Sequence, residues 1–268
     1  MPTHFTYASR AIRGARSYQE DACVFVTLPG FDQPGASSPT LTPHALLAVL
    51  ADGMGGHVGG AIASNTACNS YLSSFCQLSG DPNTRLQNAL QASNRAIAEK
   101  VKRDPKMNGM GCTLIGAVFG ASGLSWVSVG DSLLLLFRRD TLQQLNEDHS
   151  LAPMIDDLAK QGSITEAEAR DHPRRHLLTS VVAGRNIEKI DLRMEAFSLF
   201  PGDCVIIASD GLQSLEHREI AQIMRDTHRD TPDAIAETLI QAVEKAEDLF
   251  QDNTTIMVVQ PHVPPIGI

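Results

Sequence analysis

The sequence has few cysteines, and none are spaced as in a zinc or redox motif. Its five cysteines are odd in number and include no CxxC pair. Four of the five lie in or next to apolar stretches, so we expect buried free thiols in a reducing compartment rather than disulfides. Thiolate ligation of a metal is not expected either.

Long hydrophobic runs and a basic surplus are also missing. No apolar run approaches the roughly 20 residues that cross a bilayer, and the first 21 residues contain no apolar core of a signal peptide. We therefore expect a cytoplasmic protein with no membrane partner. With 22 basic against 31 acidic residues, the net charge is -9 and no block of like charge stands out. A nucleic-acid binder normally has a basic face, so nucleic acid is not an expected partner.

The 268 residues, 43% of them hydrophobic, are enough for one large domain or two small ones. Strands are expected at 5–12, 23–28, 46–50, 111–119, 124–129, 133–137, 142–145, 190–197, 203–208 and 254–259, and helices at 61–75, 82–102, 217–224 and 232–248. This order favours an α+β fold with a mostly antiparallel core. Residues 147–184, with Pro- and His-containing breaks, are expected to form an insertion outside the sheets.

The most informative stretch is LLAVLADGMGGHVGG at 46–60, in which a short apolar strand ends in Asp52 and a run of glycines. Glycines let the backbone turn sharply and approach whatever the carboxylate holds. The pattern recurs in CVIIASDG at 204–211, and Asp252 and Glu20-Asp21 directly precede apolar runs. Carboxylates at several strand ends suggest one site assembled by folding. Asp-Gly is also the commonest turn dipeptide, so a purely structural interpretation stays open at this point.

A set of short motifs along almost the whole chain carries a family resemblance. In order they are RSYQED (16–21), ADGMGGH (51–57), GCT (111–113), VGDS (129–132), EDHSL (147–151), GSIT (162–165), HP (172–173), PGD (201–203), SDGL (209–212) and DNT (252–254). Together they resemble the metal-dependent protein phosphatases of the PP2C (PPM) family, bacterial type. The resemblance implies a single catalytic domain over 1–268. Its fold would be an α-β-β-α sandwich of two mainly antiparallel sheets flanked by helix pairs, with 147–184 as a flap beside the site.

The resemblance also implies an activity and a two-metal site. Phosphoserine and phosphothreonine in proteins would be hydrolysed by a bridging water activated by two Mg²⁺ or Mn²⁺ ions, which prefer oxygen ligands. Asp52 matches the bridging ligand and Asp210 and Asp252 complete one site. Glu20 and the carbonyl of Gly53 serve the other.

Three more positions match functional residues of the family. Asp21 matches a carboxylate that orients bound water, and Asp131 matches a ligand of a third, weaker metal site. Arg16 matches the phosphate clamp, because a guanidinium can bind two phosphate oxygens. GDS is also a good turn, and Arg16 has an ordinary surface role as its alternative. Asn253 is expected to fix the turn beside Asp252 rather than to bind metal.

The histidines do not supply an obvious general acid. Where many eukaryotic members have a histidine after the Asp-Gly pair, this sequence has Met54, and His57 belongs to the bacterial motif and is not assigned. His149, His172 and His176 are expected to shape the flap.

The sequence departs from the family pattern at Gln19, Ala61 and Leu133, where Asn, Glu and Arg are usual. These departures put local packing in doubt, not the two-metal chemistry.

Three functions therefore remain in view. The first is a monomeric protein phosphatase acting on a phosphoprotein, for example a substrate of a cognate Ser/Thr kinase. The second is a pseudophosphatase that binds phosphoprotein without turnover, and the third is a small-molecule phosphomonoesterase using the same site. A thiolate phosphatase is not expected, because the sequence has no Cys-x₅-Arg signature.

Overall fold

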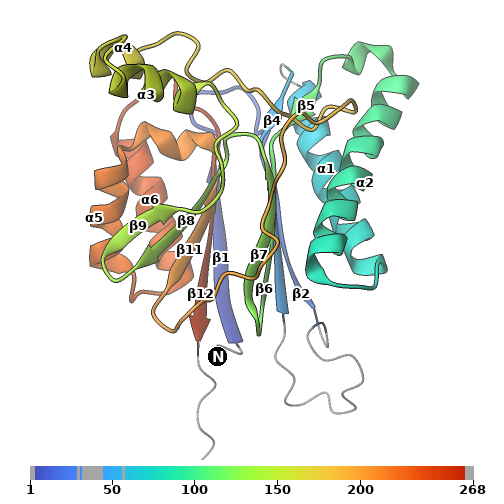
Figure 1. Cartoon of the computed structure of the whole chain (residues 1–268), viewed down its shortest axis with the longest axis horizontal. Helices are drawn as coiled ribbons and strands as arrows, with labels where there is room; N and C mark the ends of the chain where they lie inside the picture. Colours follow the sequence, from blue (N-terminus) through green and yellow to red (C-terminus); the bar gives the residue numbers. More distant parts are fainter. Residues whose placement is uncertain (1–3, 29–30, 32–44, 56–57, 263–268) are drawn as a thin grey trace, which may run out of the picture.

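A computed structural model describes residues 4–28, 31, 45–55 and 58–262. Two five-stranded antiparallel sheets pack face to face, and a pair of helices covers the outer face of each (Figure 1). The first sheet has the order β1 (His4–Ile12), β12 (Thr254–His262), β11 (Cys204–Ala208), β8 (Leu133–Arg138) and β9 (Thr141–Gln144). The second has the order β10 (Asp191–Leu192), β7 (Gly123–Val129), β6 (Leu114–Gly120), β3 (Ala45–Ala51) and β2 (Ala22–Leu28). The layered α+β architecture expected from the sequence is confirmed.

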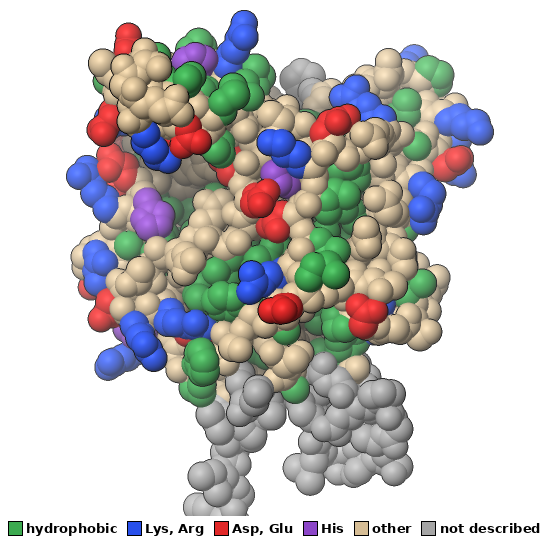
Figure 2. All heavy atoms as spheres, viewed as in Figure 1, with side chains coloured by type: hydrophobic (Ala, Val, Ile, Leu, Met, Phe, Trp, Pro, Cys, Tyr) green, Lys and Arg blue, Asp and Glu red, His purple; other side chains and the backbone are tan. Residues whose placement is uncertain are grey.

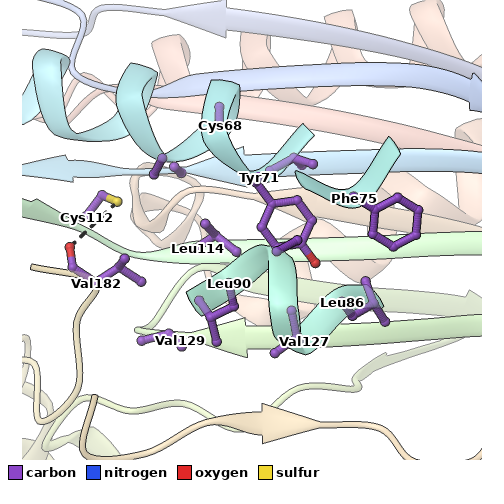
Figure 3. Close-up of a cluster of buried hydrophobic side chains, with 14 of the residues drawn as sticks. Cys68, Tyr71, Phe75, Leu86, Leu90, Cys112, Leu114, Val127, Val129 and Val182 are labelled. Carbon is purple, nitrogen blue, oxygen red and sulfur yellow. Dashed lines mark hydrogen bonds between the residues drawn. The ribbon is translucent and has the colours of Figure 1, made fainter. Parts of the chain in front are cut away.

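Four long helices form the outer layers. The second sheet is covered by α1 (Val58–Gln77) and α2 (Pro82–Arg103), and the first by α5 (His217–Thr227) and α6 (Pro232–Lys245). The predicted start of α2 is confirmed, because the Asp81 side chain accepts a hydrogen bond from Thr84 N at 3.0 Å and Pro82 occupies the first turn. Figure 3 shows how Tyr71 and Phe75 of α1 pack with Leu86 and Leu90 of α2 above the sheet.

Strand β3 explains why the central strands are apolar without alternation. Leu46, Ala48 and Leu50 face the layer between the two sheets. The alternate residues Leu47 and Val49 face α1 and α2. Because both faces of the strand are covered, every residue of β3 is buried.

Two strand predictions need correction. The strand expected at 111–119 is broken at Thr113 into β5 (Gly111–Cys112), which pairs with β4 (Gly53–Met54), and β6. Thr113 N instead donates to Asp52 O at 2.9 Å, which turns the chain from one sheet to the other. The strand expected at 190–197 is reduced to the two residues of β10. Asp191 in this segment uses its carboxylate to accept hydrogen bonds from Trp126 and Glu147. The expected loop 30–43 lies outside the described residues, except for Phe31.

The flap forms outside the sheets, as predicted. It contains α3 (Ala152–Lys160) and α4 (Glu166–Arg170), which begins with a capping box between Thr165 and Glu168. Arg175 binds both carboxylate oxygens of Asp156, at 2.5 and 3.0 Å, and so ties the end of the flap to α3. Short 3₁₀ turns complete the described structure at η1 (Pro105–Met107) and η2 (Asp210–Ser214).

The surface agrees with the absence of charge blocks in the sequence. Acidic and basic side chains are interspersed over the face shown in Figure 2. Across the described residues, no helix is long and apolar enough to span a membrane.

Candidate metal and phosphate site

The antiparallel pairing brings the acidic strand ends to one end of the two sheets. Ile12 at the end of β1 pairs with Thr254 at the start of β12, and Ala22 at the start of β2 pairs with Ala51 at the end of β3. Strands β7 and β11 end on the same side, since they are antiparallel to β6 and β12. Carboxylates separated by up to 232 positions in the sequence therefore meet at one rim.

These residues surround a cleft of about 690 Å³, which we call the acidic cleft. Of the predicted site residues, those lining it are Arg16, Glu20, Asp52, Gly53, Asp131, Asp210 and Asp252. Asp21 is buried beneath them. The structure thus brings together every site residue that the sequence predicts.

Asp52 is held by its backbone at the point where two strands break. Its N–H donates to Thr113 Oγ1 at 3.1 Å, and its carbonyl accepts from Thr113 N. Thr113 Oγ1 also lies 2.7 Å from Ser132 Oγ, so the β3–β4 and β7–β8 turns are joined. Burial raises the pKa of Asp52 well above its usual range, and the charges of Asp210 and Asp21 raise it further.

Asp21 is oriented from below by two hydroxyl groups. Ser209 Oγ and Thr255 Oγ1 each donate to its Oδ2 at 2.8 Å. Burial raises the pKa of Asp21 to about 6, although these two hydrogen bonds lower it. Its Oδ1 is buried and accepts no hydrogen bond from the described residues, so it can receive one from a bound water.

Asp131 lies in the turn between β7 and β8. Gly130, with φ of 104°, allows this turn, and its N–H donates to Nδ1 of the buried His149 at 3.2 Å. Burial raises the pKa of Asp131 to about 8, with further contributions from the charges of Asp210 and Asp148. Such a raised pKa indicates that a carboxylate at this position lacks a compensating cation from the protein.

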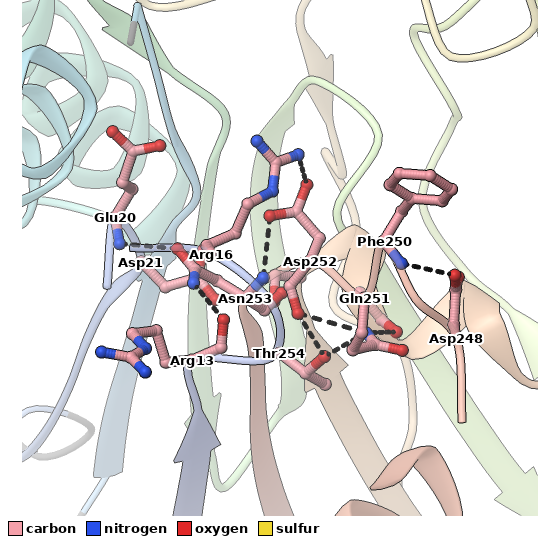
Figure 4. Close-up of polar contacts among 12 residues, drawn as sticks. Arg13, Arg16, Glu20, Asp21, Asp248, Phe250, Gln251, Asp252, Asn253 and Thr254 are labelled. Carbon is pink, nitrogen blue, oxygen red and sulfur yellow. Dashed lines mark hydrogen bonds and ion pairs between the residues drawn. The ribbon is translucent and has the colours of Figure 1, made fainter. Parts of the chain in front are cut away.

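Arg16 and Asp252 face each other across the mouth of the cleft (Figure 4). Arg16 Nη2 lies 2.5 Å from Asp252 Oδ2, and both side chains are partly exposed. Asn253 fixes the loop that carries Arg16: its Oδ1 accepts from Glu20 N at 2.7 Å, and its Nδ2 donates to the carbonyls of Arg13 and Tyr18. The Asn253 side chain thus fixes the loop before Glu20, and beside Asp252 it is the backbone N–H of Asn253 that donates to Asp252 Oδ1, at 2.7 Å.

Gly53 and Gly60 permit a close approach of α1 to the β3–β4 turn. A Cβ atom on Gly60 would lie 2.7 Å from Glu20 Oε1 and 2.9 Å from the Gly53 carbonyl carbon. A Cβ atom on Gly53 would lie 2.5 Å from Glu20 O. Gly53 is therefore needed for backbone packing.

The donor set fits hard divalent cations. Asp210 Oδ1 is buried and unpaired within the described part of the chain, and burial together with the charge of Asp252 raises the pKa of Asp210. Oxygen ligands and mutually repelling carboxylates are what Mg²⁺ and Mn²⁺ sites require. Over the same described ranges, no three His, Cys, Asp or Glu side chains already converge on one ion position. Asp252 is directed instead toward Arg16.

Several residues of the site carried no predicted role. Thr113 and Ser132 lie within the quoted GCT and VGDS motifs, and Ser209 lies within SDGL, so the motifs marked them without showing what they bind. Thr255 had no such signal, and Gly60 belongs to the glycine-rich stretch 46–60, which indicated a close backbone approach without showing its partner. Their roles depend on contacts between elements distant in sequence.

The histidines and the departures from the motifs mostly affect local packing. His149 is buried, and burial lowers its pKa, so it holds the Gly130 turn as a neutral ring. His172 Nδ1 accepts from Arg174 N within the flap, whereas His176 lines the acidic cleft. Gln19 closes the loop before Asp21 by accepting from its N–H at 3.1 Å. His57 lies outside the described residues.

Comparison with known proteins gives a consistent result. The Protein phosphatase 2C family model matches residues 37–248. Serine/threonine protein phosphatase PstP of Mycobacterium tuberculosis is 34% identical over 194 residues, covering 69% of this chain, which spans only 36% of that relative's length. Serine/threonine phosphatase stp of Listeria innocua is 28% identical over 80% of this chain and 84% of its own. The crystal structure of the PstP catalytic domain in complex with two manganese ions has a TM-score of 0.73 at 29% identity, covering 96% of this chain and 97% of the other.

Proposed function

Because the chain belongs to the protein phosphatase 2C family, we propose that it is a metal-dependent phosphatase that hydrolyses phosphoserine and phosphothreonine in proteins. The observation that carries the proposal is the acidic cleft itself, where five carboxylates and Arg16, from six separate strand ends, meet. The relatives described above are named as phosphatases, which favours turnover over phosphoprotein binding alone.

The carboxylates would hold the metal ions. Asp52, Asp210 and Asp252 would hold one ion, and Asp52, Glu20 and the Gly53 carbonyl would hold the other. When bound, two divalent cations lower the pKa of water and neutralise phosphoryl oxygens. A third ion at Asp131 would share Asp210. The complex of PstP with two manganese ions supports the core of this proposal.

The remaining side chains of the site would bind the substrate phosphate and orient a water molecule. Arg16 is exposed at the cleft mouth and would exchange its contact with Asp252 for two oxygens of the substrate phosphate. Asp21, fixed by Ser209 and Thr255, would accept a hydrogen bond from a water molecule at Oδ1 and so orient it. The residue after Asp52-Gly53 is Met54 and not a histidine, and His176 is the histidine among the described residues lining the cleft, so no donor of a proton to the leaving group is assigned.

The proposed extent and partners follow from the family. Residues 1–268 would act as a single catalytic domain with the flap at 147–184. The substrate would be a phosphorylated protein, for example one modified by a cognate Ser/Thr kinase, and the enzyme would act as a cytoplasmic monomer with Mg²⁺ or Mn²⁺.

The test is phosphate release from a phosphothreonine peptide by the purified chain. We expect no activity in excess EDTA and recovery when Mn²⁺ or Mg²⁺ is added back. Asp52→Asn should be inactive with metal present while melting as a folded protein. Turnover that is unchanged in EDTA, with metal content checked, would exclude the proposed mechanism.

A further inference from the structure

Residues 180–189, a loop that begins within the C-terminal part of the flap, border a second hollow beside the acidic cleft. The hollow has a volume of about 310 Å³. Leu178, Val181 and Arg185 line both the hollow and the acidic cleft. The two spaces are therefore neighbours, and Arg185 lies at the boundary between them.

The ends of the 180–189 loop are fixed. Ser180 Oγ donates to Lys189 O at 2.7 Å and accepts from Lys189 N at 2.9 Å. Val182 pairs with Cys112 of β5 through two backbone hydrogen bonds of 3.0 and 2.9 Å, and Figure 3 shows Val182 beside that strand. The loop is thus anchored to the same strand pair that carries Gly53.

The backbone beneath Arg185 is held against α2. Asn94 of α2 accepts from Gly184 N at 2.8 Å and donates to Arg185 O at 2.7 Å. Gly184 has φ of 75°, and a Cβ atom there would lie 2.7 Å from Ala98 Cα. A glycine at this position lets the loop touch the helix. The two hydrogen bonds of Asn94 then fix the backbone from which the Arg185 side chain projects.

The guanidinium of Arg185 is available to a ligand. The residue is exposed, and its side chain forms no ion pair with any other described residue. Glu188 on the same loop accepts from Asn186 Nδ2 at 3.1 Å instead. Glu188 also lines the hollow. At the boundary of the acidic cleft, Arg185 is therefore a cation with a fixed backbone and no ion pair to a carboxylate of the described residues.

We propose that Arg185 and the adjoining hollow form a specificity subsite that binds an acidic group of the substrate near the phosphorylated residue. The group is either a side-chain carboxylate or a second phosphate, since both accept paired hydrogen bonds from a guanidinium. This inference rests on the proposed function for its substrate class. Arg185 binds the flanking group and not the reacting phosphate, and Asn94 is its positioning residue.

The experiment compares matched phosphothreonine peptides that carry Ala, Glu, Lys or a second phosphothreonine at each position from three before to three after the target. The parent with Mn²⁺ should prefer the Glu or doubly phosphorylated peptide at one or more of these positions. Arg185→Ala should remove that preference, lowering kcat/KM for acidic peptides by about fivefold, as for a partly exposed ion pair, chiefly through KM. Arg185→Glu should favour the Lys peptide. Hydrolysis of p-nitrophenyl phosphate, which has no flanking group, should not change.

Two further variants separate a loss of the subsite from the general effect of removing a surface charge. Arg103→Ala removes an exposed arginine at the end of α2, outside the cleft and the hollow, and should behave as the parent. Asn94→Ala should weaken the preference for acidic peptides and leave p-nitrophenyl phosphate hydrolysis intact. Equal kcat/KM for all peptides in the parent, or an unchanged preference in Arg185→Ala, would overturn the proposal while leaving the phosphatase function in place.

A binding measurement distinguishes failure of the subsite proposal from failure of the proposed phosphatase function. Phosphonate versions of the same peptides, which resist hydrolysis, are titrated against the parent and Arg185→Ala by fluorescence anisotropy. Tighter binding of acidic peptides that depends on Arg185 would support the subsite even if no peptide were hydrolysed. Equal binding of all peptides would reject it independently of turnover.

Discussion

At the scale of single residues, Arg16 has two possible anionic partners. Its guanidinium contacts Asp252 at 2.5 Å, and the same side chain lines the cleft where a phosphate would bind. The loop beneath it is fixed by Asn253, so the side chain needs only to rotate between the two partners. A residue of this kind contributes to substrate binding more than to the chemical step.

Arg16→Ala should therefore raise KM more than it lowers kcat. The loss in kcat/KM should be roughly 1.5–3 kcal/mol, as for a missing charge-assisted contact. Steady-state kinetics on a phosphothreonine peptide measures it, with Arg13→Ala as the control, because Arg13 is an exposed neighbour outside the acidic cleft. Kinetics equal to the parent would remove Arg16 from the site.

The charge of Asp131 lowers folding stability but serves the proposed function. It is buried among carboxylates, and its pKa of about 8 means that its ionised form opposes folding near neutral pH in the absence of a cation. Its position beside Asp210 fits a ligand of a third ion. Stability and turnover should therefore respond in opposite directions when its charge is removed.

Asp131→Asn should melt a few degrees higher than the parent in EDTA at pH 8, since the isosteric amide removes a buried charge. Its kcat with Mn²⁺ should fall by more than about tenfold, because the ligand of the third ion is lost while the two-metal core is intact. Melting, metal stoichiometry and kcat are measured on the same preparation. A folded variant with parental kcat would restrict Asp131 to the turn.

At the scale of elements, the position of α1 depends on two adjacent glycines with different surroundings. Gly60 lies against Glu20 and Gly53, whereas among the described residues a Cβ atom on Gly59 would meet only Met110 Cβ, at an ordinary 3.6 Å. Both belong to the first turn of α1. They provide a matched pair in which helix propensity is the same and steric contact differs.

Gly60→Ala should lower the free energy of unfolding by roughly 1–3 kcal/mol, because the methyl group forces α1 away from the β3–β4 turn. It should also weaken Mn²⁺ binding, measured by calorimetry, since Glu20 must move. Gly59→Ala should change stability by less than about 1 kcal/mol and leave Mn²⁺ binding unchanged. Similar results for the two variants would show that close packing at Gly60 is unimportant.

At the scale of the whole molecule, the cleft concentrates buried acidic groups in a chain that is already negative. The pKa values of Asp21, Asp52, Asp131 and Asp210 are all raised, with burial as the first cause. A raised carboxylate pKa means that the folded state keeps a proton that the unfolded state has released. For each such group, the protein is therefore destabilised as pH rises from the pKa of the unfolded state to the higher pKa of the folded state.

In EDTA, the free energy of unfolding should rise as pH is lowered below about 8, where Asp131 takes up a proton in the folded state, and should rise more steeply below about 6, where Asp21 does the same. With saturating Mn²⁺ the trend should reverse, because protons compete with the ion for the same carboxylates. Urea unfolding across this range measures both slopes, and Asp131→Asn should flatten the slope in EDTA. Parallel slopes with and without Mn²⁺ would contradict a shared site.

The sequence by itself determined the layers and the identity of the acidic residues. Apolar runs that end at Asp52 and Asp210 define buried strands with a carboxylate at the rim, and Asp81-Pro82 defines the start of α2, because each depends only on local pattern and capping. Most strand positions could be predicted for the same reason. The order of the short motifs was specific enough to indicate the family.

Only the tertiary structure decided how the site is held together. The break at Thr113, the hydroxyls of Ser209 and Thr255 on Asp21, and the clamp of Asn94 on Arg185 join residues from 61 to 234 positions apart. No local propensity encodes such pairs. They form because two sheets, each covered on its outer face, can bury their apolar strands only by bringing these strand ends to one rim.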